Sequence, residues 1–243
     1  EIKFICLNKI LIDDISSKFK RNNLKILNLY CSSYVKSLNY KNKFDNKDYI
    51  IFLDIGYERT TGLIFNNYKF EFFKSIPLGG NNITKDISKV LKLDLNYSEN
   101  LKLNFNKDEN ELSLSKNSFN DTNIYSELIK KNISIDLLKQ IIEERINEII
   151  KLAITQNNFF KNNISVIKPI VIFTGGGSKL LSNNFNIDFN KYFSELIFFN
   201  ENDTAIFEAG MQYHRSDERF LIKDYKKTNK IGLFEKFFNL FSK

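Results

Sequence analysis

The sequence is poor in the residues that build several common kinds of protein. It has 9 glycines and 2 prolines in 243 residues, too few for a long disordered linker or a turn-rich all-β fold. Its 2 cysteines, Cys6 and Cys31, cannot form a disulfide framework and are typical of a cytosolic protein. Because the sequence has a single histidine, His214, we expect no histidine-based metal site or catalytic triad.

Long apolar runs are also missing from the sequence. No run approaches the ~18 residues that a membrane-spanning helix needs, and the opening residues do not resemble a signal peptide. The chain starts with Glu1 in an apolar run at residues 2–7, so we expect it to be a fragment of a longer protein. With 42% hydrophobic residues, it can bury a sizeable core in one or two domains.

The formal net charge of the chain is +7. A positive excess invites a nucleic-acid-binding interpretation. However, the lysines are spread along the chain beside abundant asparagine, isoleucine and phenylalanine, and they form no stripe interleaved with aromatic residues. We therefore predict no nucleic-acid partner.

Hydrophobic patterns alternate between the periods of strands and helices, which predicts an α/β fold. Helical spacing occurs over residues 10–19 and 138–153, and Thr84 and Asp203 can each cap a further helix. Asn66-Asn67 tolerates positive φ and predicts the turn of a β-hairpin. Strands are expected at residues 2–7, 25–30, 49–54, 60–65, 70–76, 169–174 and 196–199.

Three loops that contain glycine form the candidate site. At residues 54–56, a carboxylate that ends a buried strand can hold hydrated Mg²⁺, and a glycine lets backbone amides approach a phosphate. At residues 79–80, two glycines open a helix whose N-terminus suits an anion or a ribose. At residues 175–177, consecutive glycines predict that a flat or charged group packs on the backbone. Ordinary tight turns would also explain the first two loops.

The order and spacing of these loops resemble the second half of the actin-like ATPase fold of the ribonuclease H-like, Hsp70–actin superfamily. Within that superfamily, the chain resembles the FtsA family of bacterial cell-division proteins. The resemblance is collinear along the chain and weakest between about residues 105 and 131. It is carried by DIGYERTTGLIF (54–65), IPLGGNNITKDISKVL (76–91), SENLK (98–102), IVIFTGGGSKL (170–180) and TAIFEAGMQYH (204–214).

The resemblance implies that ATP and Mg²⁺ bind to these loops. It places Asp54 near the metal ion and the terminal phosphates, with Gly56 and Thr60 in the phosphate hairpin. It also implies that Glu99 and Lys102 face the ribose and that residues 175–178 lie against the adenosine. The implied cofactor-binding residues are Asp54, Gly56, Thr60, Gly79, Gly80, Glu99, Lys102, Gly175, Gly176, Gly177 and Ser178, and Asp54 is the implied metal ligand.

Two departures from the family pattern bear on turnover. Tyr57, Glu58 and Arg59 stand where the family usually has small residues. The first phosphate loop of the superfamily has no counterpart here, since residues 1–45 resemble only the return of the first domain. We therefore expect the intact protein to bind nucleotide with weak or no ATP hydrolysis.

The last residues of the chain have the pattern of an amphipathic helix. At 100° per residue, seven apolar side chains fall on one half of the helix and polar side chains on the other. Burying seven such side chains yields at most about 10–20 kcal/mol, and ordering a dozen residues removes most of it at roughly 1–2 kcal/mol each. We predict a weak, reversible membrane anchor that prefers anionic lipid. Its apolar face consists of Ile231, Leu233, Phe234, Phe237, Phe238, Leu240 and Phe241.

These observations predict an actin-like adaptor that self-assembles and tethers the tubulin-like polymer FtsZ to the cytoplasmic face of the membrane at the division septum. The FtsZ contact is implied by the family resemblance alone. The alternatives are an actin-like partner of a pilus or secretion assembly, as in the PilM family, and a sugar- or acetate-kinase-type enzyme. The expected organisation is a first-domain remnant (1–45), a second actin-like domain (46–215) with a helical insertion at about 91–165, a linker (216–230) and the amphipathic helix (231–243).

Overall fold

The computed structural model describes residues 5–41, 43–44, 49–67, 69–105, 133–156, 158–163, 168–181, 193–199, 201 and 204–225. The chain divides into two compact units. Unit 1 comprises residues 1–8 and 41–202, and unit 2 comprises residues 9–40 and 203–243. Unit 2 therefore combines two segments that are far apart in the sequence.

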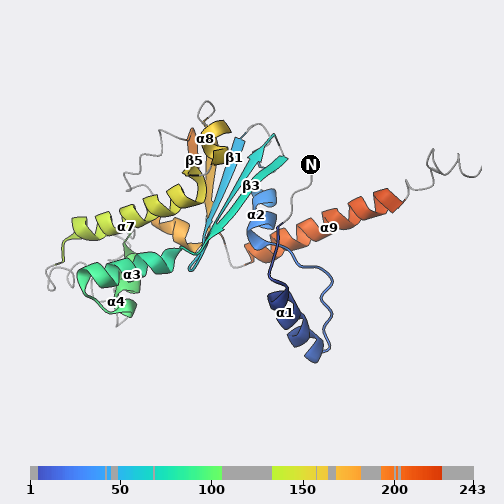
Figure 1. The fold of residues 1–243 in the computed structure, drawn as a ribbon, viewed down its shortest axis with the longest axis horizontal. Helices are drawn as coiled ribbons and strands as arrows, with labels where there is room; N and C mark the ends of the chain where they lie inside the picture. Colours follow the sequence, from blue (N-terminus) through green and yellow to red (C-terminus); the bar gives the residue numbers. More distant parts are fainter. Residues whose placement is uncertain are drawn as a thin grey trace, which may run out of the picture. The chain divides into compact units, whose positions relative to one another are not determined.

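Unit 1 is built on a five-stranded mixed sheet in the order β3-β2-β1-β4-β5 (Figure 1). The antiparallel pairs are β1–β2 and β2–β3, and the parallel pairs are β1–β4 and β4–β5. These strands confirm the five predictions between residues 49 and 199, and Asn67 adopts the positive φ of 44° expected at the hairpin turn. The strands are β1 (Tyr49–Ile55), β2 (Thr60–Asn66), β3 (Lys69–Ile76), β4 (Ile170–Thr174) and β5 (Glu195–Phe198).

The continuous apolar run of β1 is explained by its central place in the sheet. Residues 50–53 are almost fully buried, and Ile51 and Leu53 belong to one hydrophobic core with residues of the helices of unit 1. Strands buried on both faces are apolar at every position rather than at alternate ones. The core thus fixes the end of β1, where Asp54 lies.

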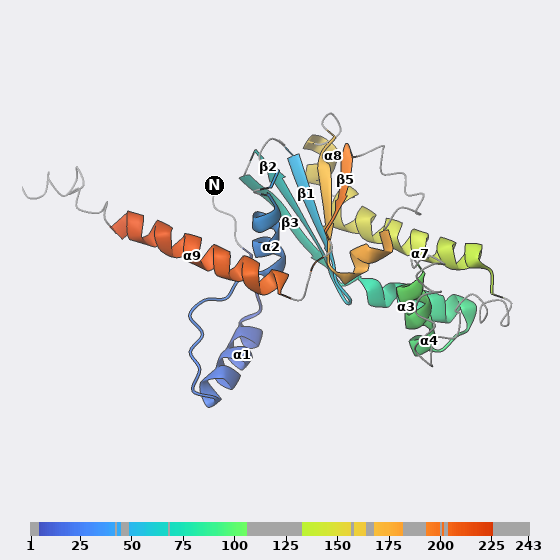
Figure 2. The same cartoon turned by 180° about the vertical axis from the view of Figure 1, so that it is seen from behind.

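The described helices of unit 1 are α3 (Gly80–Leu91), α4 (Leu95–Asn104), α7 (Ile135–Ile150) and α8 (Asn158–Asn163). A π-helical turn, Lys151–Thr155, continues α7, and a 3₁₀ helix, Gly176–Leu181, follows β4. Helix α7 confirms the prediction for residues 138–153, because Leu138, Ile142 and Ile146 recur at helical spacing on its buried face. Helix α3 packs against both α4 and α7 beside the sheet (Figure 2).

The predicted start of α3 is wrong. Thr84 does not cap the helix, which begins four residues earlier, at Gly80. The Asn82 side chain accepts a 3.0 Å hydrogen bond from the N–H of Gly79, and the Thr84 hydroxyl donates to the Gly80 carbonyl instead. An asparagine that supports the first turn therefore replaces the expected threonine cap.

Unit 2 contains α1 (Lys9–Arg21), α2 (Ser32–Lys41) and α9 (Ala205–Tyr225). Helix α1 confirms the prediction for residues 10–19, and Asn23 ends it with a positive φ of 57°. Helix α9 continues to Tyr225, so residues 216–225 of the expected linker are helical. The Asp203 cap and the amphipathic segment 231–243 lie outside the described residues.

The strand predicted at Lys25–Tyr30 is wrong, and residues 5–7 of the predicted first strand are not extended in a sheet either. A strand needs a hydrogen-bonded neighbour, and no described strand pairs with this segment. Side-chain contacts hold it instead: the Tyr30 ring meets that of Tyr213 edge-on at 5.1 Å, and its hydroxyl lies 3.1 Å from His214 Nδ1.

Among the described residues, no helix combines the length and apolar character needed to cross a membrane.

Candidate functional site

The first and third glycine loops meet at the carboxyl ends of β1 and β4. These strands are parallel neighbours, with Asp54 in register with Thr174, so their ends open at the same edge of the sheet. A Cβ atom added to Gly175 would lie 2.7 Å from Asp54 Oδ1. The fold therefore brings the half-buried Asp54 directly against the third loop.

Two of the three glycines in the third loop are required by packing. Gly175 has a φ of +83°, and a Cβ there would lie 2.5 Å from the Ile55 carbonyl oxygen. A Cβ on Gly177 would overlap the Ile55 side chain. In contrast, Gly176 is exposed, and a Cβ there would meet no other described residue within 4 Å beyond its neighbours in the chain. Gly176 is thus the glycine whose backbone is open to a bound molecule.

Ser178 and Glu201 fix the third loop from within unit 1. The buried Ser178 hydroxyl donates a 2.7 Å hydrogen bond to the Gly175 carbonyl. The Glu201 carboxylate accepts a 3.1 Å hydrogen bond from the Gly175 N–H. Sequence analysis missed Glu201, because it follows the last strand without a motif and only the fold brings it near residue 175.

The second loop docks onto the first. The N–H of Gly80 donates to the Gly56 carbonyl at 2.9 Å, and the N–H of Asn81 donates to the Tyr57 carbonyl at 2.7 Å. A Cβ on Gly79 would lie 2.5 Å from both of these carbonyl oxygens. The amides of the first helical turn, usually left without a partner, thus hold the 56–59 turn in place.

Glu99 and Lys102 lie together on α4, against the start of α3. The Lys102 ammonium donates to the Gly80 carbonyl (3.0 Å), Thr84 Oγ1 (2.8 Å) and Glu99 Oε2 (2.7 Å), and its side chain is only 5% exposed. The Thr84 hydroxyl also contacts the Glu99 carboxylate. All three ammonium donors therefore have acceptors, and Glu99, with 27% of its side chain exposed, is the more accessible member of the pair.

Thr60 stands at the start of β2, next to the 56–59 turn. It is fully buried, and its hydroxyl has no hydrogen-bond partner among the described residues. A buried polar group without a partner is uncommon and calls for an explanation. Among the described residues, no three or more His, Cys, Asp or Glu side chains are grouped so that they could hold a metal ion.

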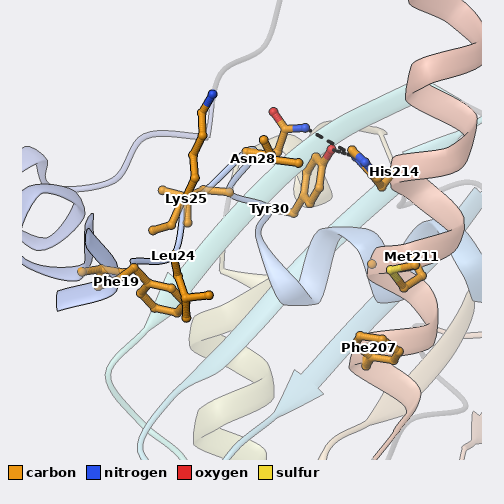
Figure 3. A pocket seen from close by; sticks show the side chains of 13 residues that line it. Phe19, Leu24, Lys25, Asn28, Tyr30, Phe207, Met211 and His214 are labelled. Carbon is orange, nitrogen blue, oxygen red and sulfur yellow. Dashed lines mark hydrogen bonds between the residues drawn. The ribbon is translucent and has the colours of Figure 1, made fainter. Parts of the chain in front are cut away.

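A separate apolar hollow of about 550 Å³ lies within unit 2. Figure 3 shows Phe19 and Leu24 on its wall, with Phe207 and Met211 projecting from α9. The Asn28 amide and the Tyr30 hydroxyl both contact His214 Nδ1, at 3.4 Å and 3.1 Å, and all three residues line the hollow. It shares no residue with the three glycine loops.

The strand order of unit 1 and its converging loops define an actin-like fold, in agreement with solved structures. MreB5 of Spiroplasma citri bound to AMPPNP superimposes with a TM-score of 0.62 at 14% identity, over 90% of this chain and 68% of that one. The same protein bound to ADP gives a TM-score of 0.54 at 14% identity, over 88% and 68%. The predicted fold is confirmed.

The chain belongs to the FtsA family. The model of the family "Cell division protein FtsA" matches residues 51–184, more than half of the chain and all three glycine loops. The cell division protein FtsA of Streptococcus pneumoniae serotype 2 (strain D39) is 26% identical over 143 residues, which are 59% of this chain and 31% of that protein. The chain thus spans about a third of the length of this curated relative.

Proposed function

We propose that this chain is part of an ATP-binding, actin-like division protein that tethers FtsZ filaments to the cytoplasmic face of the membrane at the septum. One observation carries the proposal: three glycine loops meet at one edge of the sheet in a member of the FtsA family. Family membership supports the role in division, and the geometry of the loops supports the nucleotide.

The residues present fit a nucleotide with Mg²⁺. Gly176 leaves its backbone open, Thr60 has a buried hydroxyl without a described partner, and Asp54 stands at the end of β1. A single carboxylate suits Mg²⁺, because this ion keeps several of its waters and neutralises phosphate charge when bound.

Each loop has a role in this proposal. Asp54 would hold the metal, Gly56 and Thr60 would bind phosphate, and Gly79 with Gly80 would keep the phosphate turn in place. Glu99 would bind the ribose, with Lys102 fixing its orientation, and residues 175–178 would support the adenosine. None of these residues is assigned to bond cleavage, and we expect weak or no hydrolysis.

We further propose that the tail at residues 231–243 anchors the protein on membrane and that FtsZ binds elsewhere on the molecule. The sequence pattern of the tail supports the first statement, and family membership supports the second. One tail binds weakly, whereas many tails on a self-assembled filament bind tightly through avidity. Nucleotide state would then control attachment by controlling assembly.

Sedimentation with lipid vesicles tests the tether. We expect the protein to sediment with vesicles that contain anionic lipid, and Phe237→Glu combined with Phe241→Glu to abolish this while unfolding is unchanged. The matched control, Asn239→Glu with Ser242→Glu, adds the same charge on the polar face and should still sediment. If the double phenylalanine variant sediments like the wild type, the tail is not the anchor.

A further inference from the structure

In the turn at residues 56–59, the side chains of Tyr57 and Glu58 each contact a neighbouring helix. The Gly56 N–H donates to the Arg59 carbonyl at 2.9 Å and closes the turn. The Tyr57 ring centroid lies 5.7 Å from the Lys102 ammonium, within the range of a cation–π contact. The Glu58 carboxylate accepts a 2.6 Å hydrogen bond from the Asn81 side-chain amide.

Glu58 therefore places a localised negative charge on this turn. The two residues that precede Glu58 in the turn, Gly56 and Tyr57, also accept hydrogen bonds from α3 through their carbonyls. The hydrogen bond from Asn81 keeps the carboxylate beside the turn although Glu58 is exposed. Arg59 adjoins it and is also exposed, so its positive charge reduces the field of Glu58 without removing it.

We propose that Glu58 sets the nucleotide preference of the site by weakening the binding of the nucleoside triphosphate relative to that of the diphosphate. This rests on the proposed nucleotide-binding function. ATP carries one more negative charge than ADP, so a fixed carboxylate on the phosphate turn repels ATP more strongly. Because the group is solvent-exposed, the effect is moderate and decreases as salt screens it. A neutral side chain at position 58 removes the repulsion and leaves the turn intact.

Calorimetric titration of the intact protein with Mg²⁺–ATP and Mg²⁺–ADP at low salt tests this inference. Glu58→Gln removes the charge but retains an oxygen that can accept from Asn81. In this variant, we expect the dissociation constant for ATP, divided by that for ADP, to fall by about three- to tenfold. The decrease should be smaller at high salt. The control, Glu144→Gln on α7, removes the same charge from an exposed position outside the three loops and should leave the ratio unchanged.

The possible results separate the two proposals. If wild type and Glu58→Gln bind both nucleotides with the same ratio, or if Glu144→Gln shifts the ratio equally, Glu58 does not set the preference. If the wild-type protein and the variant bind neither nucleotide, the proposed nucleotide-binding function fails, and this inference fails with it.

Discussion

At the scale of single residues, Thr60 is unusual because its side chain is fully buried and yet carries a polar hydroxyl. Its hydroxyl is buried without a described partner, although an apolar side chain of the same shape would avoid that penalty. Its neighbour on β2, Thr61, donates to Ser75 Oγ at 3.4 Å and is satisfied. The pair therefore provides a test in which the same substitution removes a hydroxyl that has a partner and one that does not.

We expect Thr60→Val to raise the free energy of unfolding by about 1 kcal/mol, because it removes an unsatisfied buried group. The same variant should bind ATP more weakly if the hydroxyl contacts phosphate. Thr61→Val should not stabilise the protein. Denaturant unfolding and nucleotide titration measure the two effects, and a loss of stability in Thr60→Val would show that its hydroxyl has a partner in the folded protein.

At the scale of secondary-structure elements, an ion pair joins α3 to α7. Arg145 Nη2 donates to Asp86 Oδ1 at 3.0 Å, and its Nε donates to the other carboxylate oxygen, so the contact is bidentate. The hydrogen bond with Asp86 raises the pKa of Arg145 above its ordinary value. The side chains are only 25% and 27% exposed, unlike most surface ion pairs.

We expect Asp86→Asn to lower the free energy of unfolding by about 1 kcal/mol, since it replaces a charged bidentate contact with a neutral one. The control is Asp14→Asn, which breaks the well-exposed pair between Asp14 and Lys18 on α1 and should have no measurable effect. Equal unfolding curves for the wild type and Asp86→Asn would mean that this pair does not stabilise the contact between α3 and α7.

The sequence predicted those elements whose pattern is local. Local patterns are sufficient to predict β1 from its apolar run, the hairpin from Asn66-Asn67 and α7 from its helical spacing. Burial and turn geometry act directly on each residue type in these segments. Residues 25–30 had the composition of a strand, but strand formation depends on a neighbour that no short pattern specifies.

The location of the candidate site can be predicted from the sequence, but the contacts of its residues cannot. Its glycine loops are visible as motifs, and the parallel pairing of β1 with β4 explains why two of them meet. The sequence does not reveal which of these glycines are required by packing. Gly175 and Gly177 are needed for packing on Ile55, and only Gly176 is free of such a contact. The contacts of Glu58 and Glu201 join residues 23 and 26 positions apart, which spacing alone cannot reveal.

At the scale of the whole molecule, this chain is an actin-like member of the FtsA family, and the proposed function requires its three loops to form one nucleotide site. Gly176 tests this requirement most directly, because an added methyl group there meets no atom within 4 Å among the described residues beyond its neighbours in the chain. Gly210 on α9 is equally open with respect to the described residues, lies outside the three loops, and provides the matched control.

The deciding measurement is a titration of the intact protein with Mg²⁺–ATP, as wild type, Gly176→Ala and Gly210→Ala, alongside the unfolding curves of all three. We predict about tenfold weaker binding for Gly176→Ala, because a methyl group would crowd a nucleotide packed on that backbone. Its stability should match the wild type, and Gly210→Ala should bind normally. Unchanged affinity in Gly176→Ala, or no binding by the wild type, would contradict a nucleotide site at these loops.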